Sequence, residues 1–116
     1  MTRRTASTLY GNLDLLVLHT LSVVESTHGL GIMDTIEQRS NGSILVEDGA
    51  IYRSLHRLEE HGLLGSEWRI SDKNRKAKFY SLTPAGKKEL VRALSEWKLN
   101  TRAVGQVLGL RWELSS

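Results

Sequence analysis

Apolar residues recur at intervals of three and four along the first half of the chain, which is the spacing of amphipathic helices. The first predicted helix covers about residues 12–26, and its stripe consists of Leu13, Leu16, Val17, Leu21 and Val24. After the break "THGLG", a second helix ends near Arg39, and a third runs from about Glu47 to His61, followed by Gly62. Between the second and third helices, "SNGS" predicts a turn and "ILV" (44–46) predicts a short buried extended segment.

The pattern then changes from helical to alternating, which is typical of strands. The segment "LLGSEWRI" (63–70) predicts a strand with Trp68 and Ile70 on one face. The segment "AKFYSLT" (77–83) predicts its antiparallel partner, with Tyr80 and Leu82 on one face and Phe79 on the other. The hydrophilic segment "SDKNRK" joins the two strands as a turn.

Thr83 and Pro84 predict the start of a long final helix, because a hydroxyl N-cap precedes a proline at the first helical position. If this helix runs from Pro84 to Gly109, it is about 39 Å long, which is more than a small three-helix domain can cover. A heptad seam follows its length: Leu90, Leu94, Trp97, Thr101, Val104 and Leu108.

The seam predicts a homodimer joined through the final helix. Leu15 and Leu18 lie off the main stripe of the first helix, so that helix needs to be covered from a second side. These two leucines could complete the dimer core. The alternative is that the seam packs on Leu15 and Leu18 of its own chain.

Composition places the chain among single-domain globular proteins, with 116 residues of which 40% are hydrophobic and 25% charged. Cysteine is absent, which excludes disulfides and thiolate metal sites and fits a cytoplasmic protein. Arg3 and Arg4 precede an apolar run that imitates a secretory signal, but Asp14 interrupts that run. Because the run is also too short to cross a bilayer, we expect a core helix and no membrane partner.

Positive charge is concentrated in one segment. Between Trp68 and Lys88 there are seven basic residues against Asp72 alone, a local balance of +6. Since the whole chain carries +3, the rest of it carries −3. A basic segment on an otherwise acidic body indicates a surface for polyanions, and the alternative is a solvated charged hairpin.

Three helices followed by a two-stranded hairpin with a basic turn is the order of a winged helix-turn-helix. The predicted fold class is therefore mainly α (α+β), with a two-stranded wing and a long C-terminal dimerisation helix. We expect residues 1–83 to form the DNA-binding domain and residues 84–116 the dimerisation helix and tail. In such folds the third helix enters the major groove and reads bases near its N-terminal end.

This order of elements predicts that double-stranded DNA is the partner and that the third helix and the wing carry the residues that contact it. On the third helix, Arg53 could bind a guanine through two hydrogen bonds, and Tyr52 and Ser54 could bind phosphates. Arg57 is left out, because Glu60 three residues later predicts an intrahelical ion pair. The complete candidate set is Tyr52, Arg53, Ser54 and His56 on the helix and Lys73, Arg75, Lys76 and Lys78 on the wing.

Four segments together resemble the PadR family of transcriptional regulators: "LDLLVLHTL", "HGLGIMDTIEQRS", "IYRSLHRLEEHGLL" and "NRKAKFYSLTPAGKKEL". The single short C-terminal helix is similar to the compact subgroup of that family. The resemblance implies a homodimeric repressor on a pseudo-palindromic operator, with DNA contacts at Tyr52, Arg53, His56, Arg75 and Lys78. Many relatives have proline where Arg53 stands, so a base contact by Arg53 would be particular to this chain.

The resemblance also implies that a small aromatic effector could bind near the dimer interface. Trp97, in the middle of the seam, is the candidate residue to stack on such a molecule. The alternative is that Trp97 only fills the dimer core.

Two other functional classes compete with a DNA-binding regulator. An enzyme is disfavoured, because the chain has no phosphate loop, nucleophile elbow or paired carboxylates, and His56 and His61 do not share a helix face. We therefore expect no catalytic residue, no metal site and no cofactor. A winged helix used only for protein–protein contact would have a neutral or apolar wing, whereas this wing is basic.

Overall fold

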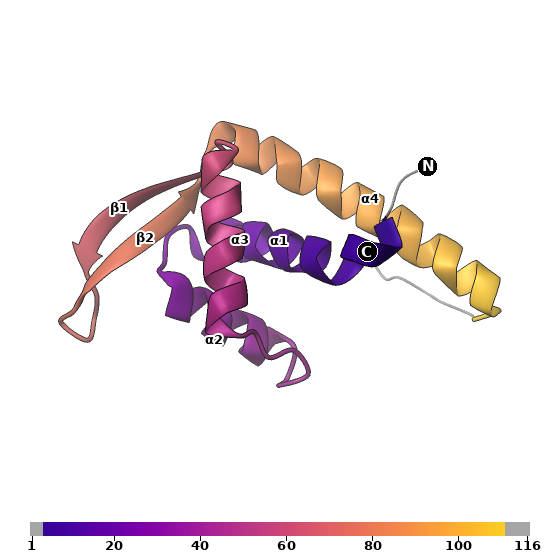
Figure 1. Ribbon diagram of the computed structural model, residues 1–116, viewed down its shortest axis with the longest axis horizontal. Coiled ribbons are helices and arrows are strands. Elements are labelled where there is room, and N and C mark those ends of the chain that lie inside the picture. Colours follow the sequence, from indigo (N-terminus) through magenta and orange to yellow (C-terminus); the bar gives the residue numbers. More distant parts are fainter. Residues whose placement is uncertain (1–3, 111–116) are drawn as a thin grey trace.

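The computed structural model describes residues 4–110, with side chains from residue 12 onward. In this part of the chain four helices and a two-stranded antiparallel sheet follow one another (Figure 1). In chain order they are α1 (Arg4–Val24), α2 (Gly29–Arg39), α3 (Asp48–Glu60), β1 (Leu64–Ile70), β2 (Lys76–Leu82) and α4 (Pro84–Leu108). The predicted mainly helical fold, with a hairpin wing and a long C-terminal helix, is confirmed.

Helices α1, α2 and α3 enclose the core, with β1 and β2 closing one end of it. The most deeply buried apolar side chains are Val17, Leu18, Leu21, Ile32, Ile36, Ile51, Leu55, Leu58, Leu64 and Tyr80. Burying one such leucine or isoleucine stabilises the fold by about 1.5–3 kcal/mol. Leu18 is only 2% exposed in the single chain, so the expectation that it joins a dimer core is wrong.

Helix α3 ends in a way that starts the wing. The N–H of Leu63 donates to the carbonyl of Leu58 and that of Gly62 donates to Glu59, both at 3.0 Å. Gly62 has a φ of +74°, a left-handed conformation that glycine adopts without strain. This Schellman motif turns the chain directly from α3 into β1, as the predicted stop at Gly62 requires.

Thr83 closes the base of the wing. Its hydroxyl accepts a hydrogen bond from the N–H of Gly86 at 3.0 Å, which confirms the predicted N-cap of α4. The same hydroxyl donates to the carbonyl of Gly62 at 2.7 Å. The end of α3 and the start of α4 are thus held together, and the hairpin projects from this junction (Figure 1).

Strand β2 makes backbone hydrogen bonds along both of its edges. It pairs with β1 in a register that runs from Leu64 opposite Leu82 to Ile70 opposite Lys76. On its other edge, Thr27 and Tyr80 exchange backbone hydrogen bonds of 2.9 and 3.3 Å. The connection between α1 and α2 therefore anchors the wing to the helices.

Two boundaries differ from expectation. Helix α1 begins at Arg4 rather than near residue 12, because apolar spacing marks only the part of a helix that packs on a core. Residues 44–46 form no strand, and the prediction of a buried segment there is wrong: Ile44 is 41% and Leu45 72% exposed. No neighbouring strand pairs with this segment, so it crosses the surface as a loop.

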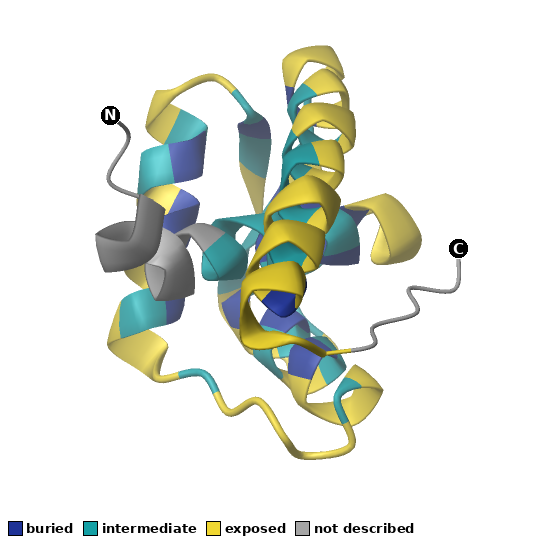
Figure 2. Cartoon of the chain, turned by 90° about the vertical axis from the view of Figure 1, so that its right-hand side faces the viewer, coloured by how far each residue is buried: buried dark blue, intermediate teal, exposed yellow. Residues whose placement is uncertain are grey.

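Helix α4 lies beside α1, and the molecule as a whole, α4 included, measures 51 × 29 × 26 Å. Leu90 packs against the core, whereas Val104 is 57% and Leu108 64% exposed. Figure 2, which views the molecule from the end where α4 terminates, shows its later turns largely exposed. None of the helices described here has a stretch of the length and hydropathy needed to cross a membrane.

Candidate nucleic-acid interface

Helix α3 presents three of its four predicted DNA-contact residues to solvent. Tyr52, Arg53 and His56 are exposed, on the side of the helix away from the buried Ile51, Leu55 and Leu58. This division follows from the helical period, since positions 51, 55 and 58 form the inward stripe. The outward face therefore carries an aromatic hydroxyl, a guanidinium and an imidazole close together.

Ser54, the fourth candidate, faces inward. Its side chain is fully buried and its hydroxyl donates to Oδ1 of Asp14 on α1 at 2.6 Å. The prediction that Ser54 binds a DNA phosphate is therefore wrong, because its only polar atom is enclosed and already paired.

Arg57 binds the same carboxylate. Its Nη2 and Nε donate to Oδ1 and Oδ2 of Asp14 at 2.6 and 3.1 Å, and this hydrogen bonding raises the pKa of Arg57. The expected ion pair between Arg57 and Glu60 is replaced by this link between α3 and α1. Glu60 lies instead 3.6 Å from Nε2 of His56, on an open part of the surface.

The side chains of Tyr52 and Arg53 occupy space that nearby glycines leave open. The ring of Tyr52 lies against the start of α2, where a Cβ on Gly29 would come within 2.8 Å of it. Arg53 extends back toward the N-terminal end of α3, and a Cβ on Gly49 would lie 3.1 Å from its Nη1. Arg53 thus reaches the end of the helix that reads bases in helix-turn-helix proteins.

The wing turn carries three exposed cations, Lys73, Arg75 and Lys76. The turn is ordered by its own backbone: the N–H of Ser71 donates to the carbonyl of Arg75 at 2.7 Å, and that of Asn74 donates to Ser71 at 2.9 Å. Asn74 adopts a φ of +58°, which asparagine tolerates better than most residues. A defined turn therefore presents these charges to solvent.

Lys78, the fourth wing candidate, is directed back toward α3. Its Nζ donates to Oε1 of Glu59 at 3.1 Å and lies 5.6 Å from the centre of the Tyr80 ring. The hydroxyl of Ser66 donates to the other oxygen of Glu59 at 2.6 Å. These hydrogen bonds, above all that from Ser66, lower the pKa of Glu59, and the bond to Glu59 raises the pKa of Lys78. Lys78 thus braces the wing against α3.

The opposite face of the wing is held by a different set of contacts. The guanidinium of Arg69 lies 4.5 Å from the centre of the Phe79 ring and donates to the hydroxyl of Ser26 at 2.7 Å. His28, which caps α2 through its Nδ1, meets the edge of the same phenylalanine at 5.1 Å. With Glu59 on one face and the α1–α2 connection on the other, the base of the hairpin is fixed in direction.

A groove of about 830 Å³ opens between α1 and α4. The apolar part of its wall includes Leu15, Leu18, Trp97, Thr101, Val104 and Leu108. The later part of the seam, from Trp97 to Leu108, therefore lines a groove beside the described side chains of α1 in its own chain. Asp14 and Arg57 form part of the same wall, so the carboxylate that holds α3 also borders the groove.

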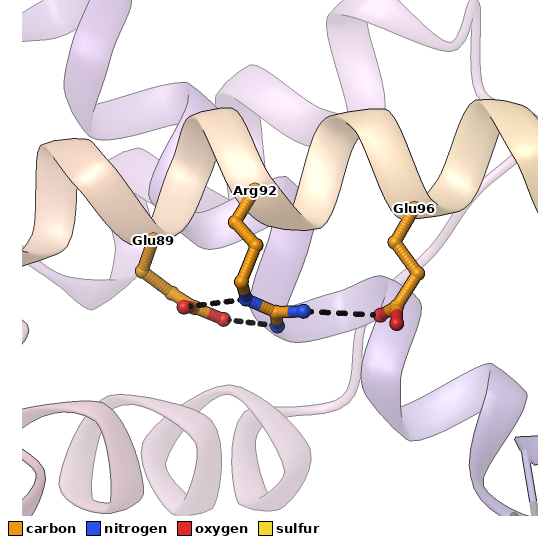
Figure 3. Close-up of polar contacts among 3 residues, drawn as sticks. All are labelled: Glu89, Arg92 and Glu96. Carbon is orange, nitrogen blue, oxygen red and sulfur yellow. Dashed lines mark hydrogen bonds and ion pairs between the residues drawn. The ribbon is translucent and has the colours of Figure 1, made fainter.

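Three charged residues of α4, Glu89, Arg92 and Glu96, also line this groove, and they bind one another (Figure 3). Arg92 donates to Glu89 at 2.9 and 2.6 Å and to Glu96 at 3.5 Å. The hydrogen bonds from Arg92 lower the pKa of Glu89, and those carboxylates in turn raise the pKa of Arg92. Among the side chains described, no cluster of three or more histidine, cysteine or acidic residues could hold a metal ion.

Comparison with known proteins identifies the family. The model of the PadR-like family of transcriptional regulators matches residues 17–92, which is more than half of the chain. The chain belongs to this family. PadR-like proteins are transcriptional regulators rather than enzymes, and they bind DNA. The arrangement of α3 and the wing is therefore that of a DNA-binding regulator.

Individual relatives agree with the family. The transcriptional regulator Rv3488 of Mycobacterium tuberculosis (strain ATCC 25618 / H37Rv) is 43% identical over 63 residues, which cover 52% of this chain and 58% of that protein. The crystal structure of a PadR family transcriptional regulator from Eggerthella lenta DSM 2243 is 28% identical, with a TM-score of 0.73, and the match covers 90% of this chain and 88% of that one. A transcriptional regulator from Clostridium thermocellum shares the fold, with 23% identity, a TM-score of 0.76, and 86% and 96% of the two chains covered.

The sequence did not identify Asp14 as a residue that supports α3. Its removal tests how much the stability of this PadR-like regulator depends on it. We expect Asp14→Ala to lower the free energy of unfolding by about 1–3 kcal/mol, because the buried hydroxyl of Ser54 loses its acceptor. The loss should shrink in a Ser54→Ala background, where that hydroxyl is absent. Urea unfolding at one fixed protein concentration measures both effects.

Asp34→Ala, which removes an exposed carboxylate from α2, is the control and should change stability little. Equal effects of Asp14→Ala in the two backgrounds would contradict the coupling between Asp14 and Ser54.

Proposed function

We propose that this PadR-like protein is a homodimeric repressor that binds a pseudo-palindromic DNA operator in the cytoplasm and is released by a small aromatic effector. The observation that carries the proposal is that one residue of the recognition helix α3, Glu59, is bound to the wing. Glu59 joins α3 to the wing, so the outward face of α3 and the cations of the wing turn are held in a fixed relation. In this proposal one duplex meets both surfaces at once.

The two surfaces have different roles in this proposal. Arg53, with Tyr52 and His56, enters the major groove and reads bases, the guanidinium pairing with a guanine. Lys73, Arg75 and Lys76 contact phosphates and add affinity without sequence information. Lys78 contributes mainly by holding the wing in place, since Glu59 already neutralises its charge.

A second copy of the chain is the proposed occupant of the apolar side of α4. Leu94, Val104 and Leu108 lie on the heptad seam and are 37%, 57% and 64% exposed in the single chain. Leu15 and Leu18 both border the adjoining groove, but Leu15 is only partly buried and stays in the proposed interface, whereas Leu18 belongs to the core and does not. In this scheme residues 1–83 bind DNA and residues 84–116 dimerise, with half-sites about 10 base pairs apart or a multiple of that.

The effector part of the proposal rests on the groove itself. Trp97 lines the groove, and so do the polar side chains of Asn12 and Asn100, which could orient a planar ring through hydrogen bonds. An aromatic molecule stacked on Trp97 would compete with, or reshape, the packing of the second chain.

The wing should supply charge rather than sequence recognition. After an operator has been selected from random DNA fragments, we expect Arg75→Glu with Lys76→Glu to weaken binding to operator and unrelated DNA alike. The log–log salt slope should become shallower by about 2, since two phosphate contacts are lost. Fluorescence anisotropy at about 50 mM and about 200 mM salt measures both quantities.

The matched control is Arg102→Glu on α4, which removes an exposed cation away from the wing and should leave the slope unchanged. Loss of preference for one base with an unchanged slope would contradict a phosphate role. A wild-type protein that binds no DNA at low salt would favour a winged helix for protein–protein contact.

The seam of α4 should set the oligomeric state. We expect Val104→Glu with Leu108→Glu to convert the dimer to a monomer, because four like charges would meet across one apolar seam. Sedimentation equilibrium measures the mass, and the monomer should bind the operator much more weakly.

Leu99→Glu provides the control for the seam. Leu99 is 67% exposed and lies on the opposite side of the heptad, so the dimer should persist. A wild-type monomer at micromolar concentration, or a dimer that survives both seam charges, would overturn this part of the proposal.

Trp97 should report an effector. In a Trp68→Phe, Trp112→Phe protein, Trp97 is the single tryptophan, and we expect its emission to be quenched by an active member of a panel of phenolic acids. The same compound should lower the anisotropy of the labelled operator bound to wild-type protein. Release of DNA without any change in Trp97 emission would place the effector elsewhere.

A further inference from the structure

Two large apolar side chains on the wing face solvent. Trp68 is 60% and Ile70 64% exposed, and both stand at alternating positions of β1, on one face of the strand as predicted. Neither belongs to the core, which reaches only as far as Leu64 and Tyr80 on this sheet. The fold therefore gives these two side chains no structural partner of their size.

The register of the hairpin shows which way they face. Ser66, Trp68 and Ile70 on β1 share a face with Lys76, Lys78 and Tyr80 on β2. Ser66 and Lys78 bind Glu59 of α3, so this face is turned toward α3. Trp68 and Ile70 continue the same face of β1 toward the tip of the hairpin. Figure 1 shows this hairpin leaving the end of α3 at an angle to that helix.

A cation accompanies the exposed indole. The Nζ of Lys76 lies 5.5 Å from the centre of the Trp68 ring, within the range of a cation–π contact. Lys73 and Arg75 stand exposed in the adjoining turn. An apolar surface bordered by cations suits a partner that has apolar walls flanked by negative charges. The minor groove of DNA is such a partner, since deoxyribose forms its walls and phosphates line its edges.

We propose that Trp68 and Ile70 contact the minor groove beside the major groove occupied by α3, with Lys76 on a flanking phosphate. The inference rests on the proposed function, because α3 must first dock for the inner side of the wing to meet the duplex. The apolar contact adds affinity that does not depend on counterion release. Trp68 and Lys76 are neighbours, but Trp68 contributes affinity through apolar contact and Lys76 contributes it through its charge.

Salt dependence separates the two kinds of contact. Trp68→Ala should weaken operator binding by about tenfold at every salt concentration and leave the log–log slope unchanged. Lys76→Ala should make the slope shallower by about 1. Trp68→Phe should retain most of the affinity, since a flat apolar ring is kept.

Leu99→Ala is the matched control, because it truncates an exposed apolar side chain on α4 and should leave DNA affinity unchanged. Thermal melting of each variant by circular dichroism separates a lost contact from a lost fold.

The fluorescence of Trp68 gives a second, independent readout. In a Trp97→Phe, Trp112→Phe protein, operator binding should quench the Trp68 emission or shift it to the blue. Operator binding with unchanged Trp68 emission, or an unchanged affinity of Trp68→Ala, would overturn the inference and leave the proposed function standing. A wild-type protein that binds no DNA at low salt would overturn both.

Discussion

The placement of the recognition surface depends on one carboxylate. Asp14 on α1 accepts hydrogen bonds from Ser54 and Arg57, one helical turn apart on α3, and so fixes the rotation of α3 about its own axis. With Ser54 turned inward, Arg53 and His56 must point outward. Glu59 then sets the direction of the wing from the same helix. Two acidic side chains thus position the surface that we propose to meet DNA, itself a polyanion.

The local elements of the fold were predictable because their signals are local. Thr83 with Pro84 marks a helix start, and Gly62 marks a helix end, through interactions within a few residues. Partners distant in sequence were not predictable. The partner of Arg57 lies 43 residues away, and a plausible partner, Glu60, lies close by in sequence. Ser54 did leave a signal, since it sits inside the stripe formed by Ile51, Leu55 and Leu58, as did Asp14 by interrupting an apolar run.

The spacing of apolar residues predicts that one face of a helix or strand will be covered, but it does not predict whether the same chain or a partner covers that face. Leu18 lies off the main stripe of α1 and proves to be core, whereas Leu45 and Ile70 lie in apolar segments and prove to be exposed. The heptad seam of α4 has the same ambiguity: Leu90 packs against the core, whereas Trp97, Val104 and Leu108 line an open groove beside α1. For the seam, the position of α1 relative to α4 decides which residues are covered. That position is a property of the whole fold and cannot be predicted from the spacing within α4.

The groove between α1 and α4 shares Asp14 and Arg57 with the back of the recognition helix. An occupant that displaces either side chain alters the support of α3, and a duplex that tightens α3 alters the wall of the groove. Binding in the groove and binding of DNA are then linked by one coupling free energy, which is the same whichever ligand binds first. Whatever factor the occupant applies to the affinity for DNA, DNA must apply to the affinity for the occupant.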